Sequence, residues 1–174
     1  MKEEVEESAI RQRIIYELNF INKGYKMLSL RPHHILDIVR NIGNDRPIMP
    51  HEYGHLVHEI TRQIISNIDT KCKLTISNDD ICGPCRMLTI KKECVDVLHQ
   101  LDPPISKQVY NDELDRKIMT FLSLEQNTVL TIRQYLVKIK NSMDSIVDIC
   151  THPKEDKESR RTGLIKGMEK LGIE

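Results

Sequence analysis

Aliphatic residues recur every three or four positions along most of the chain, and this spacing constrains the fold more than any other feature. Between His51 and Asp69, six residues share one helical face: Tyr53, Leu56, Val57, Ile60, Ile64 and Ile68. Similar stripes predict helices near residues 3–22, 35–43, 110–122 and 131–143. Trp is absent and aromatic residues make up 4% of the sequence, so the core must be built from Ile, Leu, Val and Met.

β-Structure is favoured in two short stretches, residues 73–77 (KLTIS) and 128–130 (TVL). We therefore expect a mostly α (α+β) fold, a compact helical domain with one or two short strands and a Cys-rich metal loop. The 174 residues divide into an N-terminal helical appendage at 1–26, a central domain at 27–153 and a C-terminal helical tail at 154–174.

The charge balance limits the classes of partner. Lys plus Arg and Asp plus Glu both number 26, and this neutral balance argues against nucleic-acid binding. The sequence contains no apolar run of the length that spans a membrane, so we expect no membrane partner. The first seven residues (MKEEVEE) are acidic and do not look like a signal peptide, which predicts a cytoplasmic protein.

Three of the five cysteines have the spacing of metal ligands. Cys82 and Cys85 flank a Gly-Pro turn, and Cys94 follows after eight residues. A tetrahedral zinc ion or a cubane [4Fe–4S] cluster takes four ligands, and Cys150 is the expected fourth. Cys72 has no turn around it and is interpreted as a core thiol. Without an export signal, an odd number of cysteines favours metal binding over disulfides.

Several interpretations of these cysteines stay open at this stage. One CxxC pair with two isolated cysteines is closer to iron–sulfur proteins than to paired zinc knuckles, but ligand count alone does not separate the two metals. A thioredoxin-like dithiol would need a βαβ context, which the sparse strands do not favour. The residues could also be small buried hydrophobic side chains.

Two strings in the sequence carry a resemblance to a known family. Residues 30–36 (LRPHHIL) and 78–85 (NDDICGPC), followed by Cys94, resemble the DUF1284 family of small bacterial and archaeal proteins. The resemblance runs from about residue 28 to 150 and implies iron–sulfur binding by the domain at 27–153. Family members carry a Cys where this chain has Asp37, and a second cysteine group where it has only Cys150.

The adjacent His33 and His34 begin a predicted helix, where neighbouring side chains point about 100° apart. We therefore expect one of them to face the cofactor or a ligand to it, and the other to cap the helix or meet solvent. Asp37 is either an oxygen ligand that replaces the family cysteine or an acid on the helix surface.

Residues 51–55 (HEYGH) match the HExxH signature of zinc proteases, in which two imidazoles bind zinc and the Glu activates water. The motif directly follows Pro50, and His51, His55 and the nearby His58 all face away from the aliphatic stripe of the predicted helix. We therefore interpret them as surface histidines.

The sequence thus predicts a small cytoplasmic metal-binding protein that holds an iron–sulfur cluster through Cys82, Cys85, Cys94 and Cys150. Its partner would be a redox protein or another protein, and no substrate can be named. The alternative is a zinc-stabilised structural or interaction module. A weaker alternative is a metal-dependent hydrolase of the HExxH type.

Overall fold

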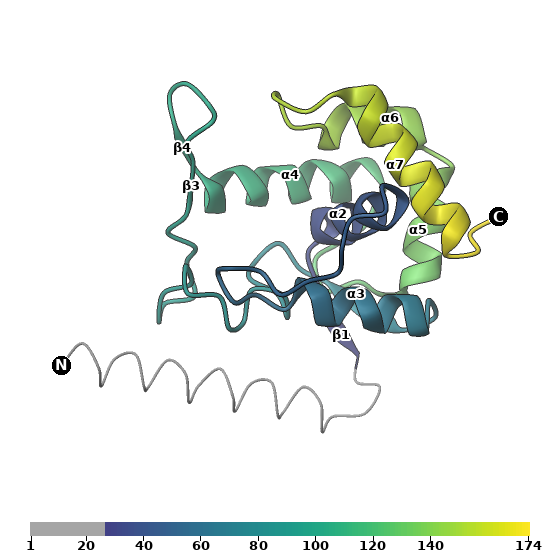
Figure 1. Ribbon diagram of the computed structural model, residues 1–174, viewed down its shortest axis with the longest axis horizontal. Helices are drawn as coiled ribbons and strands as arrows, with labels where there is room; N and C mark the ends of the chain where they lie inside the picture. Colours follow the sequence, from purple (N-terminus) through teal and green to yellow (C-terminus); the bar gives the residue numbers. More distant parts are fainter. Residues whose placement is uncertain (1–26) are drawn as a thin grey trace.

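The computed structural model describes residues 27–174, which form six helices and two small sheets (Figure 1). The helices are α2 (Pro32–Gly43), α3 (Val57–Ser66), α4 (Lys107–Phe121), α5 (Ile132–Lys140), α6 (Met143–Cys150) and α7 (Lys157–Lys170). The strands are β1 (Leu28–Leu30), β2 (Lys71–Leu74), β3 (Val97–Leu98), β4 (Ile105–Ser106) and β5 (Val129–Thr131). This arrangement confirms the predicted α+β class. The predicted helix at 3–22 and the appendage at 1–26 lie outside the described residues.

A three-stranded sheet in the order β1-β2-β5 fixes the start of α2. β1 pairs with β2 in parallel, with Leu30 opposite Leu74, and β2 pairs with β5 in antiparallel orientation. Pro32 then occupies the first turn of α2, where its missing N–H costs no hydrogen bond. As a result, His33 and His34 emerge at a rigid junction between the sheet and a buried helix.

α2 lies at the centre of the fold and packs most extensively against α7. The two helices approach through Gly43, Gly163 and Gly167, and a Cβ atom at Gly43 would overlap the backbone oxygen of Gly163. α7 forms most of residues 154–174, for which the sequence predicts a helical tail. The packing of α7 on α2 holds Arg160 against the first turns of α2.

α5 contributes fully buried side chains to the core. Its predicted capping box is present, because the Thr131 hydroxyl accepts from the Gln134 N–H and the Gln134 side chain accepts from the Thr131 N–H. The Tyr135 side chain is fully buried and its hydroxyl donates to the Pro32 carbonyl at 3.2 Å. Cys72 is also fully buried.

The predicted helix between His51 and Asp69 begins six residues later than expected. Residues 51–56 form turns, and α3 starts at Val57. Gly54 has a φ of 76°, a conformation that is incompatible with a continuing helix. The expectation that all the histidines here lie on the surface is also wrong, because His58 is buried.

Residues 79–96, which carry three cysteines, consist of turns and one isolated bridge between Leu88 and Cys94. None of the helices in residues 27–174 is long and apolar enough to cross a membrane.

Candidate metal centre

One cavity of about 370 Å³ brings together all the residues that the sequence singled out as ligands or their neighbours. It lies between α2, the start of α4, the turns of residues 79–96 and the contact of α6 with α7. Among the residues that line it are His33, His34, Asp37, Cys82, Cys85, Cys94 and Cys150. Cys72 does not line it, in agreement with its place in the core.

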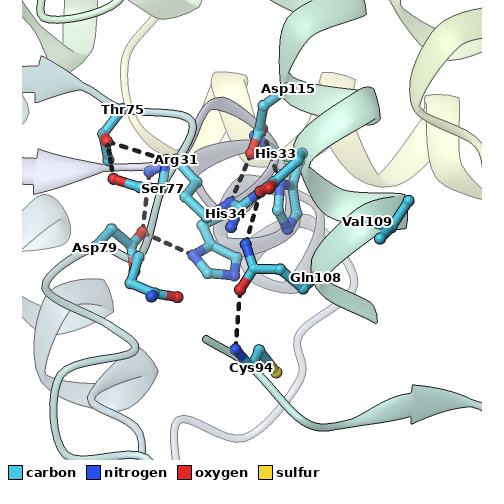
Figure 2. A network of polar contacts seen from close by, with 12 residues as sticks. Arg31, His33, His34, Thr75, Ser77, Asp79, Cys94, Gln108, Val109 and Asp115 are labelled. Atoms are coloured by element: carbon cyan, nitrogen blue, oxygen red, sulfur yellow. Dashed lines mark hydrogen bonds and ion pairs between the residues drawn. The ribbon is translucent and has the colours of Figure 1, made fainter. Parts of the chain in front are cut away.

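The Nδ1 atom of each imidazole lies within hydrogen-bond distance of a buried carboxylate (Figure 2). His33 Nδ1 lies 2.8 Å from an Asp115 oxygen, and His34 Nδ1 lies 2.7 Å from an Asp79 oxygen. A carboxylate at Nδ1 holds a proton there, which leaves Nε2 as the nitrogen that a metal would bind in competition with a second proton. Both rings line the cavity with centroids 4.4 Å apart, so the expectation that only one would face it is wrong.

Asp79 connects the cysteine-bearing turns to α2. Its carboxylate accepts hydrogen bonds from the backbone N–H groups of Arg31, Ile81 and Cys82 at 2.9 to 3.1 Å, in addition to that from His34. Burial alone would raise the pKa of Asp79, but His34 and these N–H donors lower it to about 2. The ionised Asp79 therefore fixes the His34 ring and the Cys82 backbone at once.

A second set of contacts holds Cys94. Its backbone N–H donates to the Gln108 side-chain oxygen at 2.9 Å, and the Gln108 amide donates to Asp112 at 2.8 Å. Arg31, which is 2% exposed, donates to Asp112 at 2.5 Å and to Asp115 at 2.6 Å. Figure 2 shows how this network runs from Cys94 to the histidines.

The Cys82 and Cys85 thiols are protonated in the metal-free chain. Burial raises the pKa of Cys82, and the neighbouring Asp79 raises it further. Burial also raises the pKa of Cys85. A metal that binds these sulfurs must therefore displace their protons, which makes binding weaker at low pH.

The ligand atoms of His34, Asp79 and Cys82 all lie within 4.8 Å of one another. Within residues 27–174, no other group of three or more His, Cys, Asp or Glu side chains meets that spacing. Cys85 and Cys94 line the same cavity but lie outside this close set.

Cys150, the last residue of α6, lines the same cavity and contacts a buried cation. Arg160, which is 3% exposed, donates from Nε to the Cys150 sulfur at 3.0 Å. The same guanidinium donates to Asp37 at 3.1 Å and to Glu155 at 3.0 Å. Burial raises the pKa of Cys150, and Arg160 only partly offsets this rise. Cys150 and Asp37 thus share one buried cation.

The HExxH string does not form the geometry of a zinc-protease helix, because residues 51–55 lie in turns. The rings of His51 and His55 stack with centroids 3.8 Å apart, and His51 Nδ1 accepts from the Tyr53 N–H at 3.1 Å. Both rings nevertheless line the cavity. Burial lowers the pKa of His55 to about 4, with the nearby His51 as a smaller cause.

Sequence reasoning missed Asp112, Asp115 and Gln108, which lie on α4 and reach residues far away along the chain. Asp79 stands in the NDDICGPC string, but nothing in the sequence indicated that it holds His34. The paired acidic residues next to a CxxC were the only local signal for it.

A comparison with protein families matches residues 51–154 to the family described as "Protein of unknown function (DUF1284)". Comparisons with the curated proteins and with the solved structures found no match to this chain.

Proposed function

From the premise that the chain belongs to the DUF1284 family, we propose that its cavity holds a metal centre and that this centre is an iron–sulfur cluster bound by Cys82, Cys85 and Cys94. One observation carries the proposal. The cavity gathers four cysteines that are spread over the sequence together with two imidazoles whose Nδ1 atoms are held by carboxylates. Outer carboxylates of this kind are the usual support of metal-binding histidines.

The spacing of the loop thiols supports a cluster over a single ion. A cluster is several atoms wide and takes ligands that lie farther apart than those of one ion. Cys82, Cys85 and Cys94 line one cavity without falling within 4.8 Å of one another as a set. The volume of about 370 Å³ also exceeds what one tetrahedral ion would fill.

The contacts favour His34 over Cys150 as the fourth ligand. His34 lines the cavity together with Cys82, and Asp79 engages its Nδ1, which leaves Nε2 as the nitrogen that would bind the cluster. Cys150 and Asp37 both accept hydrogen bonds from the buried Arg160, and either residue would have to give up that contact to bind a metal. Cys150 as the fourth ligand remains the competing prediction, and Asp37 is the third choice.

When bound, such a cluster supplies one-electron chemistry. The chain's own residues bind it through thiolates and orient His34 through Asp79. The apolar side chains that line the cavity shield it from water: Val57, Ile81, Met87, Leu98 and Leu114. We therefore propose a cytoplasmic redox role with a protein partner.

The second candidate is a zinc-stabilised module, which the close set of His34, Asp79 and Cys82 favours. A nitrogen, an oxygen and a sulfur atom are all ligands that zinc accepts. In that case a zinc ion bound by both side chains would replace the hydrogen bond between His34 and Asp79.

Metal analysis of protein purified without oxygen distinguishes these candidates. The proposal predicts a brown protein with iron and acid-labile sulfide in equal amounts, about four of each for a cubane cluster. Zinc without sulfide would establish the module instead. Neither iron nor zinc after reconstitution would contradict both.

A further inference from the structure

We infer that the hairpin of residues 87–95 is the docking surface of an acidic electron-transfer protein. This inference rests on the proposed function, because it names the kind of partner that the cluster serves. The hairpin follows Cys85 directly and carries Cys94 in its second arm, so it connects two of the proposed cluster ligands.

Backbone hydrogen bonds define the shape of the hairpin. The Val95 N–H donates to the Met87 carbonyl and the Thr89 N–H donates to the Glu93 carbonyl, both at 2.9 Å. The tip is a tight turn, in which the Lys92 N–H donates to the Thr89 carbonyl at 2.8 Å. A partner therefore meets a preformed surface, which lowers the entropy that binding must offset.

The hairpin exposes apolar side chains close to a proposed ligand. Ile90 is fully exposed at the tip, and Val95, next to Cys94, is 58% exposed. Ile90 stands four positions before Cys94, and a stretch of that length spans at most about 14 Å. A protein that covers Ile90 therefore lies close to the cluster.

The charge of the hairpin selects an acidic partner. Arg86, Lys91 and Lys92 are exposed, and Glu93 is the only acidic residue among positions 86–95. This segment thus has a net charge of +2 in a chain whose overall formal charge is zero. A local positive field of this kind steers a negatively charged surface and raises its rate of association.

The size and composition of the hairpin favour a redox protein over a nucleic acid. Transient electron-transfer complexes bury small interfaces, below about 1,200 Å² in total, so a single projecting hairpin is a sufficient core for one. Single-stranded nucleic acids bind cations interleaved with aromatic side chains, and positions 86–95 contain no aromatic residue. In each encounter one electron passes from the reduced centre of the partner, which is oxidised, to the cluster, which is reduced.

An acidic [2Fe–2S] ferredoxin is the probe for this surface. Its affinity for the reconstituted protein and the rate of electron transfer are measured at about 10 mM and about 200 mM salt, because added salt screens exposed charges. Lys91→Glu combined with Lys92→Glu tests the charge, and Ile90→Ser tests the apolar contact. Lys117→Glu combined with Lys138→Glu changes the net charge equally at exposed positions of α4 and α5 and is the matched control. Iron and sulfide are counted in every variant.

We expect the Lys91 and Lys92 double variant to bind ferredoxin about tenfold more weakly than its control at low salt, with slower electron transfer. This difference should shrink at high salt, whereas Ile90→Ser should weaken binding about tenfold at both salt concentrations.

Equal affinities of the double variant and its control would overturn the inference, as would a cluster-loaded original protein that does not bind ferredoxin. Tighter binding of single-stranded DNA than of ferredoxin, lost in the double variant, would overturn it in favour of a nucleic-acid surface. If the double variant assembles no cluster, an unchanged affinity in Ile90→Ser would overturn it. Absence of iron and sulfide from the original protein would instead contradict the proposed function.

Discussion

At the scale of single residues, the cysteines of the chain have separate roles that their environments define. Cys82, Cys85 and Cys94 line the cavity, whereas Cys72 is fully buried in β2, away from the cavity. Whether a cysteine of this chain can bind a metal therefore depends on whether its sulfur atom lies at the cavity or in the core.

Substitution of Ser for each of Cys82, Cys85 and Cys94 should therefore remove most of the bound metal, because a hydroxyl is a poor replacement for a thiolate. Cys72→Ala should keep the metal and lower the free energy of unfolding by about 1–2 kcal/mol through lost packing. Metal content and urea denaturation measure the two effects. If Cys72→Ala loses the metal and Cys94→Ser keeps it, the ligand assignment is wrong.

His55 should make the metal-free protein less stable in mild acid. Its pKa is about 4 in the folded chain and about 6.5 when unfolded, so the unfolded state takes up a proton first as the pH falls. The free energy of unfolding should then decrease from about pH 6.5 to about pH 4, with a slope of at most about 1.4 kcal/mol per pH unit from this residue.

His55→Gln should reduce that slope in urea denaturation at pH 7, 6 and 5, and the exposed His99→Gln should not. An equal slope in His55→Gln and the original protein would show that the burial of His55 has no such effect.

At the scale of helices and strands, the sequence predicted what depends on local pattern. The stripes of aliphatic residues located α2, α4 and α5, and Thr131 with Gln134 located the start of α5. The same method failed at His51, because an aliphatic stripe does not reveal that Gly54 adopts a positive φ.

The long-range contacts of the site could not be predicted in this way. Asp115 contacts His33 across 82 positions and Gln108 contacts Cys94 from another element. Such pairs depend on how α4 packs against α2, which no local pattern encodes. The seven expected site residues could be named because the motif and the resemblance marked them, whereas the residues that hold them in place carried no such mark.

The packing of α7 against α2 should be intolerant of any added side-chain atom. A Cβ at Gly167 would overlap the Val39 carbonyl of α2, so Gly167→Ala must push the helices apart. We expect a loss of about 3 kcal/mol or more in the free energy of unfolding, although alanine favours helices. Lys166→Ala, exposed on the same helix, should change it by less than about 0.5 kcal/mol. Thermal denaturation of both variants that gave equal midpoints would contradict this packing.

At the scale of the whole molecule, the cavity joins a rigid helical body to a segment made of turns. α5 is buried in the core, and its Tyr135 has no exposed surface. Residues 79–96 contain no helix and are held by their own turns and by single hydrogen bonds to their surroundings, such as those of Asp79 and Gln108. A bound metal should therefore order the turns far more than the helices.

Hydrogen exchange with and without metal should show this difference. Metal removal should accelerate amide exchange within residues 79–98 and leave α5 protected, because His34 and Cys82 tie the centre to α2. If α5 and α6 lose protection together with the turns, the centre is tied to Cys150 instead.

The measurement that tests the central claim most directly is pulsed electron paramagnetic resonance of the reduced protein. The account predicts an iron–sulfur signal with hyperfine coupling to a nitrogen nucleus, since His34 binds through its Nε2. The nitrogen coupling should disappear in His34→Gln and persist in Cys150→Ala. The absence of any iron–sulfur signal would contradict the account, and a signal without nitrogen coupling that vanishes in Cys150→Ala would return the fourth position to that cysteine.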